Sequence, residues 1–220
     1  MQSLVYLISV ILVLSTLIAC VPQTTNTDHS TAEAVDSTPD QTPDPTPNTQ
    51  SRPATKTVTD DWTQQQIPVK LYDQEGIPFT TYFSEPDFIV EQASSGEGTG
   101  VWFYSKLDGK KYEPAYVHIF FPSNPLTVEE MKEAVSGERG LIKTNQWTVV
   151  RRNEEVAYSW AKERIDFEKR AQPQNMIGTV YIGEYNGKAF RITEHFPADY
   201  GDGFSPRASI ILKELQLRGE

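Results

Sequence analysis

The chain has 220 residues and a single cysteine, so one copy of it can form neither an internal disulfide nor a cysteine-based zinc or iron–sulfur site. Thirty acidic residues against twenty basic ones give a formal net charge of −10. Because proteins bind DNA and RNA mainly by neutralising phosphates with Lys and Arg, this charge argues against a nucleic-acid partner.

The first feature along the chain is an apolar run at residues 4–19. It has the length of a signal-peptide core and is shorter than the roughly 20 residues that a membrane-spanning helix needs. Its end and the next residue, LIAC, resemble the bacterial lipobox. The resemblance implies that residues 1–19 are a lipoprotein signal peptide and that Cys20 is lipidated and becomes the N-terminus. The alternative is an incidental cysteine at the end of a membrane helix.

Residues 20–61 are predicted to be a disordered tether rich in Pro and Thr. Between positions 21 and 60 there are six prolines and eleven threonines, and no aromatic residue, Leu, Ile or Met. Such a segment cannot bury enough apolar surface to fold. A flexible chain of about 40 residues spans roughly 35 Å, so the tether would hold a folded domain away from the bilayer.

The remaining residues, 62–220, are predicted to form one globular domain built around two β-hairpins. The sequence Asp-Gly at positions 108–109 and the sequence Asn-Gly at positions 186–187 are both typical of two-residue type I′ turns between strands. The second turn pairs Tyr185 with Lys188. It places on one side of the hairpin Val180, Ile182, Glu184, Ala189, Arg191, Thr193 and His195.

Two further strands are predicted between the hairpins, at residues 147–152 and 156–167, with a bulge near Lys162 where the apolar phase changes. The glycine-rich GEGTG at residues 96–100 is predicted to be a loop, because the apolar segment that follows indicates a strand rather than the helix that a phosphate-binding loop needs.

Two helices have recognisable ends. Thr127 and Glu130 predict a capping box before a short helix that stops at Gly137. Ser205 is predicted to cap a second helix, with Pro206 at its first position.

These elements predict an α+β fold, an antiparallel β-sheet flanked by helices on both faces. Their order, together with the YNGKAF hairpin and the closing helix FSPRASIILKELQL, resembles the PsbP/Mog1-like α/β/α sandwich over about residues 85–218. Members of that fold are mostly accessory, assembly or binding proteins, so the resemblance implies a role of that kind. It brings no catalytic residues with it.

Candidate functional residues are few. Arg191 and His195 share the mixed side of the second hairpin, and Tyr200 lies in the long, Gly-rich segment 196–206, so these three are the predicted binding residues. His118 is predicted to be packed among aromatic residues. Two separated histidines without paired carboxylates indicate no metal site, and no sequence motif indicates a cofactor.

The sequence therefore predicts a lipid-anchored extracytoplasmic binding or assembly-accessory protein, attached to the cell membrane or the outer membrane. Its domain would face the periplasm, the thylakoid lumen or the exterior, with a protein or an envelope complex as partner. Two alternatives remain open: an extracytoplasmic enzyme of unknown substrate and a purely structural envelope protein.

The anchor can be tested by replacing Cys20 with Ser. Without the thiol no acyl group can attach, so we expect Cys20→Ser to lose labelling by a fatty-acid analogue and to leave the membrane fraction, because two or more chains are needed for durable anchoring. Labelling followed by membrane fractionation measures both. A variant that stays membrane-bound, beside an uncleaved wild-type chain, would contradict the lipobox assignment.

Overall fold

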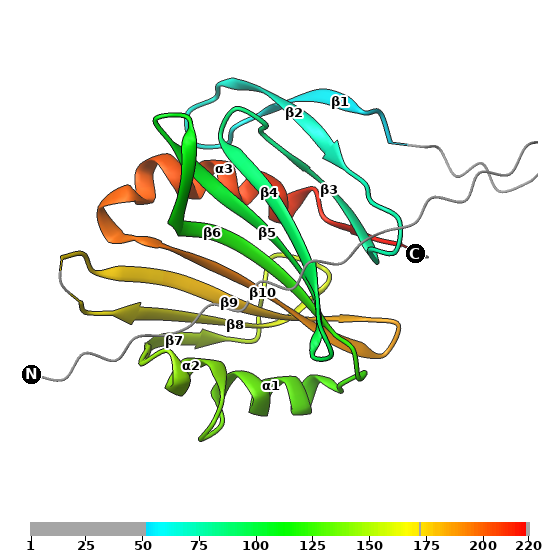
Figure 1. Cartoon of the computed structure of the whole chain (residues 1–220), viewed down its shortest axis with the longest axis vertical. Helices are drawn as coiled ribbons and strands as arrows, with labels where there is room; N and C mark the ends of the chain where they lie inside the picture. Colours follow the sequence, from blue (N-terminus) through cyan, green and yellow to red (C-terminus); the bar gives the residue numbers. More distant parts are fainter. Residues whose placement is uncertain (1–51, 172, 219–220) are drawn as a thin grey trace, which may run out of the picture. The chain divides into compact units, whose positions relative to one another are not determined.

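The structure, a computed structural model, describes residues 52–171 and 173–218 (Figure 1). The predicted signal peptide, the lipidation site Cys20 and most of the predicted tether lie outside these residues. Within the described part of the chain, no helix is long and apolar enough to cross a membrane.

Strands make up most of the described chain. The strands are β1 (Thr55–Thr59), β2 (Gln66–Tyr72), β3 (Phe79–Phe83), β4 (Phe88–Ser94), β5 (Gly98–Leu107), β6 (Lys110–Pro122), β7 (Thr148–Asn153), β8 (Ala161–Lys169), β9 (Met176–Tyr185), β10 (Lys188–Pro197) and β11 (Gln216–Leu217). The helices are α1 (Val128–Ser136), α2 (Leu141–Thr144) and α3 (Gly201–Lys213), with a 3-10 turn, η1 (Ala198–Tyr200), directly before α3.

The strands form two antiparallel sheets. A seven-stranded sheet has the order β4-β5-β6-β10-β9-β8-β7, and a four-stranded sheet has the order β1-β2-β3-β11. The predicted α/β/α sandwich is therefore wrong: the fold is mainly antiparallel β, and a second sheet stands beside α3 where the sequence predicts only a helix. The prediction missed this sheet because it assigned no strand to residues 66–83. Buried and exposed side chains alternate in β2, as is typical of a strand.

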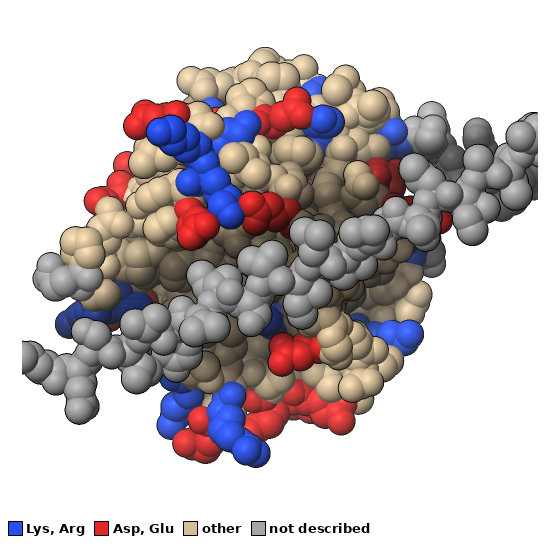
Figure 2. Space-filling model, in the orientation of Figure 1, with Lys and Arg blue, Asp and Glu red and all other residues tan. Residues whose placement is uncertain are grey.

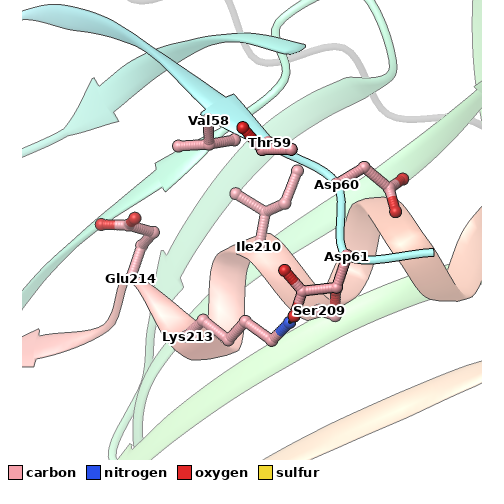
Figure 3. A pocket seen from close by; sticks show the side chains of 8 residues that line it. All are labelled: Val58, Thr59, Asp60, Asp61, Ser209, Ile210, Lys213 and Glu214. Atoms are coloured by element: carbon pink, nitrogen blue, oxygen red, sulfur yellow. Dashed lines mark hydrogen bonds and ion pairs between the residues drawn. The ribbon is translucent and has the colours of Figure 1, made fainter. Parts of the chain in front are cut away.

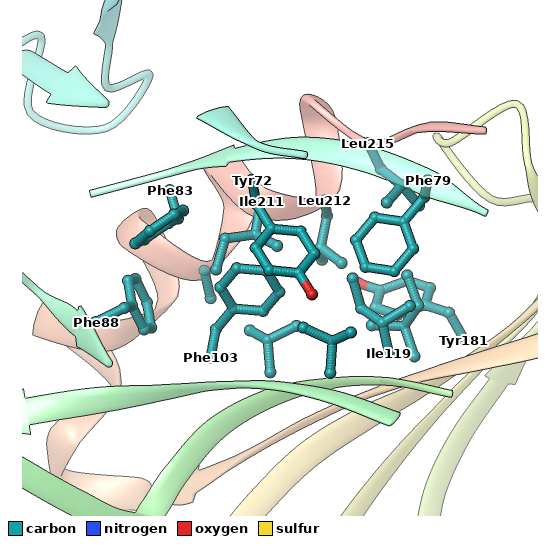
Figure 4. Close-up of a cluster of buried hydrophobic side chains, with 14 of the residues drawn as sticks. Tyr72, Phe79, Phe83, Phe88, Phe103, Ile119, Tyr181, Ile211, Leu212 and Leu215 are labelled. Atoms are coloured by element: carbon teal, nitrogen blue, oxygen red, sulfur yellow. The ribbon is translucent and has the colours of Figure 1, made fainter. Parts of the chain in front are cut away.

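The larger hydrophobic core lies between the seven-stranded sheet and the layer formed by α3 and the four-stranded sheet (Figure 4). Phe79 of β3 and Phe103 of β5 are both 0% exposed. The ring centroid of Phe121 lies 5.9 Å from that of Phe79 and 4.8 Å from that of Phe190, so the rings form a stack from one sheet to the other. Each such side chain contributes roughly 1.5–3 kcal/mol by burial.

A second core lies on the other side of the seven-stranded sheet. Met131 and Val135 of α1 pack there against Val180 and Ile182 of β9, and Trp147 joins them. Because side chains alternate along a strand, Tyr181 between the last two points into the larger core. Strand β9 is thus buried on both sides.

Both predicted hairpins are confirmed. Asn186 and Gly187 have φ values of 50° and 71°, and Asp108 and Gly109 have 53° and 74°, as type I′ turns require. Lys188 pairs with Tyr185 across the second turn, in the predicted register.

Strand β8 begins at Ala161, later than the predicted start at residue 156. Pairing with β9 shifts between Ala161 and Glu163, which confirms a bulge near Lys162. Residues 156–160 precede the strand and pack against the larger core, where the rings of Tyr158 and Trp160 stack with centroids 5.1 Å apart. Residues 156–160 therefore bury these two rings in the core and do not pair as the predicted strand.

Helix α1 has the predicted ends. The Glu130 backbone N–H donates to the Thr127 hydroxyl at 3.2 Å, and the Thr127 N–H donates to the Glu130 carboxylate at 2.8 Å. Gly137 follows the helix, and its N–H donates to the Glu133 carbonyl. The capping box is confirmed.

Helix α3 starts earlier than predicted, at Gly201, so most of segment 196–206 is not a loop. Phe204 explains the early start: it is 1% exposed and its ring lies 4.8 Å from that of Phe196. This packing outweighs the poor helix propensity of two glycines. Pro206 lies inside the first turns, where its missing N–H removes one helical hydrogen bond.

The folded unit also begins earlier than predicted, because β1 lies within the segment assigned to the tether. Asp60, which follows β1, fixes that strand to α3. Its carboxylate, 1% exposed, accepts hydrogen bonds from the backbone N–H groups of Trp62 at 2.7 Å and Thr63 at 3.2 Å. It also pairs with the Arg207 guanidinium at 3.0 Å.

Removing this carboxylate should destabilise the domain. Asp60→Ala leaves two backbone donors without their acceptor and removes one of the two carboxylates that pair with Arg207, which keeps Asp87 at 3.1 Å, so the free energy of unfolding is expected to fall by about 3 kcal/mol. Urea unfolding measures the change. The control is Asp61→Ala: this neighbour pairs with Lys213 but its side chain is 66% exposed, so its loss should amount to less than about 1 kcal/mol. Equal losses in the two variants would show that Asp60 does not fix β1 to α3.

Candidate functional site

The structure brings two of the three predicted binding residues together and separates the third. Arg191 and His195 lie on the same side of β10, away from Phe190, which belongs to the larger core. Tyr200 packs against that core, and its hydroxyl lies 3.0 Å from the Ser105 hydroxyl. Tyr200 therefore shares no surface with the other two.

Arg191 and His195 belong to a row of aromatic and basic side chains on β5, β6 and β10. We call the aromatic face the set Trp102, Tyr104, Tyr116, His118, Phe120, Arg191 and His195. All seven keep partial exposure.

Direct cross-strand pairing builds the aromatic face. Trp102 pairs with His118, Tyr104 pairs with Tyr116, and Tyr116 in turn pairs with His195. The Tyr116 and His195 rings are nearly parallel, with centroids 5.0 Å apart. Such pairs are the main side-chain contribution to sheet stability, so the face is held by the sheet itself.

His118 is stacked on Trp102, with ring centroids 4.0 Å apart. Gly100 makes room for this pair, since a Cβ there would lie 2.6 Å from both rings. Burial lowers the pKa of His118 to about 3, and Arg191 adds to the effect. Its Nε2 is buried without a partner among the described residues. His118 is thus packed, as predicted, and neutral near pH 7.

A second row of rings runs from His195 away from the aromatic face. His195 and Phe167 flank Gly178 in neighbouring strands, and their centroids lie 6.2 Å apart. A Cβ at Gly178 would lie 2.5 Å from Phe167, so a glycine is needed for the rings to approach. Trp147 stacks on Phe167 at 3.9 Å and lies 5.8 Å from His195.

The charges of the domain are mostly paired. Figure 2 shows acidic and basic side chains next to each other on one face rather than in patches of a single sign. Within the described residues, no group of three or more His, Cys, Asp and Glu side chains is placed to hold a metal ion.

One cavity, of about 320 Å³, lies between the end of β1 and α3 (Figure 3). Its charged side chains already have partners. Asp61 pairs with Lys213, and Glu214 pairs with Arg52 at 3.0 Å and Lys56 at 2.8 Å. A ligand would have to break these ion pairs, so the cavity is better explained as part of the contact between β1 and α3.

A second cavity, of about 370 Å³, lies at the end of the aromatic face; we call it the His195 cavity. Strand ends and the segment after α2 contribute its walls, which are Pro114, Tyr116, Asn145, Trp147, Lys169, Ala171, Pro173, Gln174, Met176 and His195. Only His195 of these was predicted from the sequence. The others come from five separate segments and carry no shared motif.

Glu194 is a half-buried acid that was not among the candidate residues predicted from the sequence. It shares a cross-strand row with Thr179 and Asp166, on the side opposite His195. Burial raises the pKa of Glu194 to about 7, and Arg164 opposes this only in part. Burial also acts on Asp166, but hydrogen bonds from Arg164 and Arg151 keep the pKa of that carboxyl below its usual value.

The position of Glu194 was readable from its neighbours, because it lies between Ile192 and Phe196 in strand alternation and both are buried. Neither Glu194 nor Asp166 lines the two cavities described above. The opposite pKa shifts let one carboxyl keep its proton while the other pairs with arginine, which is an arrangement that stabilises a buried cluster.

Comparison with known proteins gives a likeness of fold only. No protein family and no curated protein matches the sequence. Among solved structures, cyanobacterial PsbP (CyanoP) from Synechocystis is similar with a TM-score of 0.44 and 8% identity, over 68% of this chain and 92% of that one. A protein from Bacteroides thetaiotaomicron is similar with a TM-score of 0.42 and 12% identity, over 68% of this chain and 48% of that one. These likenesses neither assign the chain to a family nor transfer a function to it.

The protonation of Glu194 predicts a pH-dependent stability. Its raised pKa means that the folded state keeps a proton that the unfolded state loses above about pH 4.5, so this stabilisation is lost as pH rises towards 7. Glu194→Gln mimics the protonated form. We expect it to raise the free energy of unfolding by about 3 kcal/mol at pH 8 and to have little effect at pH 4.

Urea unfolding at pH 4, 6 and 8 tests this expectation. Glu155→Gln is the matched control, since that side chain is exposed. A gain from Glu194→Gln that does not change with pH would mean that the carboxyl is already ionised throughout this range.

Proposed function

We propose that this chain is a lipid-anchored extracytoplasmic binding protein whose aromatic face contacts a partner protein in the cell envelope. The observation that carries the proposal is the partly exposed row of cross-strand pairs on β5, β6 and β10. The anchor at Cys20 belongs to the proposal through the lipobox resemblance, and the named membrane is either the cell membrane or the outer membrane.

The composition of the face favours a protein partner. Trp, Tyr and Arg are the residues that dominate binding energy in protein interfaces. Here they are already locked by stacking, as Trp102 is on His118 and Tyr116 is on His195. A partner would therefore have to order few side chains on binding, and less of the contact energy is lost.

Arg191 indicates what the partner carries. Its guanidinium carbon lies 4.6 Å from the centre of the Phe120 ring, and the described residues offer it no ion-pair partner within 4 Å. Burial lowers its pKa, which shows that the charge is poorly solvated. An apolar partner surface with a carboxylate opposite Arg191 would satisfy both the charge and the rings.

A tether to the membrane suits such a face. Holding the domain near a surface raises the effective concentration of any partner in the same envelope, so a contact of modest affinity is enough. This part of the proposal rests on the sequence of residues 20–61.

Site-specific crosslinking in intact cells tests the partner. A photoreactive amino acid at Tyr104, on the aromatic face, should give one discrete crosslinked product. The additional change Arg191→Ala should reduce that product at least tenfold, because hot-spot residues each contribute 2 kcal/mol or more. Melting temperature, measured on the purified variants, should stay nearly constant.

The matched control places the same photoreactive group at Tyr200, which is also a partly exposed tyrosine but packs on the opposite side of the sheet. It should give no such product. Equal products at both positions, or a product that persists in Arg191→Ala, would reject the aromatic face as the contact surface.

A further inference from the structure

The His195 cavity has the features of a small-molecule site at the end of the aromatic face, with which it shares Tyr116 and His195. Its volume of about 370 Å³ falls within the range of ligand sites, which begins near 300 Å³. Its residues come from the ends of β6, β8, β9 and β10, from the segment that joins α2 to β7 and from the β8–β9 connection. The sheet thus fixes Tyr116, Lys169 and His195.

Three rings of a stack line one side of this cavity. The Tyr116 and His195 planes differ by 21°, with centroids 5.0 Å apart. The Trp147 and His195 planes differ by 30°, with centroids 5.8 Å apart, and Trp147 is held from behind by Phe167. Nearly parallel rings that cannot rotate favour a planar ligand, which gains by stacking on them.

His195 offers the cavity a hydrogen-bond acceptor. Its Nδ1 lies 2.9 Å from the Pro114 carbonyl oxygen, which can only accept, so Nδ1 carries the hydrogen. Burial lowers the pKa of His195, and the ring is therefore neutral near pH 7. Nε2 then carries a lone pair, and the described residues provide no hydrogen bond to it.

Lys169 offers the only charge in the wall. The other lining side chains are neutral, and within the described range no carboxylate lies within ion-pair distance of its ammonium group. It is close enough for its charge to lower the pKa of His195 further.

We propose that the His195 cavity binds a small organic acid that consists of a flat ring with a carboxylate and a ring N–H or O–H donor. The carboxylate would pair with Lys169, the ring would extend the stack formed by Tyr116, His195 and Trp147, and the donor would bond to Nε2 of His195. The same chemistry is offered by a free aromatic acid and by an acid-bearing ring within a larger molecule.

Three probes separate these contributions in the purified full chain. Indole-2-carboxylate has all three features, indole-2-carboxamide lacks the charge, and 2-naphthoate lacks the N–H donor. Isothermal titration calorimetry at pH 7.5 is expected to rank the indole acid first, with each of the other two at least tenfold weaker. Failure of all three to bind, or equal binding of the acid and the amide, would overturn the proposal.

Two variants assign the effect to named residues. Lys169→Met keeps the length of the side chain without its charge, so it should weaken the indole acid at least tenfold and leave the amide unchanged. His195→Phe keeps a ring and removes the acceptor, so it should abolish the preference for the indole acid over 2-naphthoate. Lys188→Met, at an exposed lysine in the β9–β10 turn, is the control and should change neither.

The partner proposal is tested separately, because Lys169→Met should leave crosslinking at Tyr104 intact. Binding of the indole acid that is unaffected by both Lys169→Met and His195→Phe would show that the acid binds elsewhere and would reject the cavity. Thermal unfolding of each variant shows that a lost affinity does not come from a lost fold.

Discussion

Burial of strand β10 on both sides is the constraint on which the rest of the structure depends. Its neighbours are β6 and β9, so it lies in the middle of the seven-stranded sheet. Phe190 and Ile192 point into the larger core and are 0% exposed, whereas Ala189 points into the second core and is 2% exposed. The strand thus joins the layer of α3 and the four-stranded sheet to the layer of α1 and α2, and Arg191, Glu194 and His195 have to be accommodated on it with only partial contact with water.

Glu194, His195 and Arg191 of β10 are accommodated in different ways, and these differences define the chemistry of the domain. Burial raises the pKa of Glu194 to about 7, and protonation below that pH removes the cost of a charge beside the core. His195 remains neutral by donating to a carbonyl and stacking on Tyr116. Arg191 keeps its charge and lies over Phe120, because a guanidinium is the cation best suited to an aromatic surface. His195 and Arg191 each keep a group that can still bind a ligand or a partner, whereas Glu194 does not.

Local signals in the sequence predicted the parts of the fold that local forces decide. The turn at Asn186 and Gly187 needs two positive φ values, and the capping box at Thr127 needs only its own helix, so both were predictable. The start of α3 was not, because it depends on Phe204 packing against Phe196, a contact between elements. The four-stranded sheet was missed for two reasons: the alternation in β2 was left unassigned, and β1 is held by Asp60 and Arg207, which are far apart in the sequence.

The same distinction explains how much of the candidate site could be predicted. Strand alternation placed Arg191 and His195 on one side of the second hairpin, and the structure agrees. It could not place Lys169 or Trp147 beside His195, because four strands and the α2–β7 segment meet there only after the sheet has formed.

The position of these residues on the sheet also determines whether the candidate site can change its shape on binding. The predicted candidate was the segment 196–206, and a loop could adapt its shape to a partner. The residues of the aromatic face instead stand on strands whose other side chains form the core, such as Tyr116 beside Val117, which is 0% exposed. Moving them would disturb the packing of the core, so the aromatic face, and with it the part of the His195 cavity formed by Tyr116 and His195, is formed before anything binds. Preformed sites of this kind select a partner by shape and charge rather than by rearrangement.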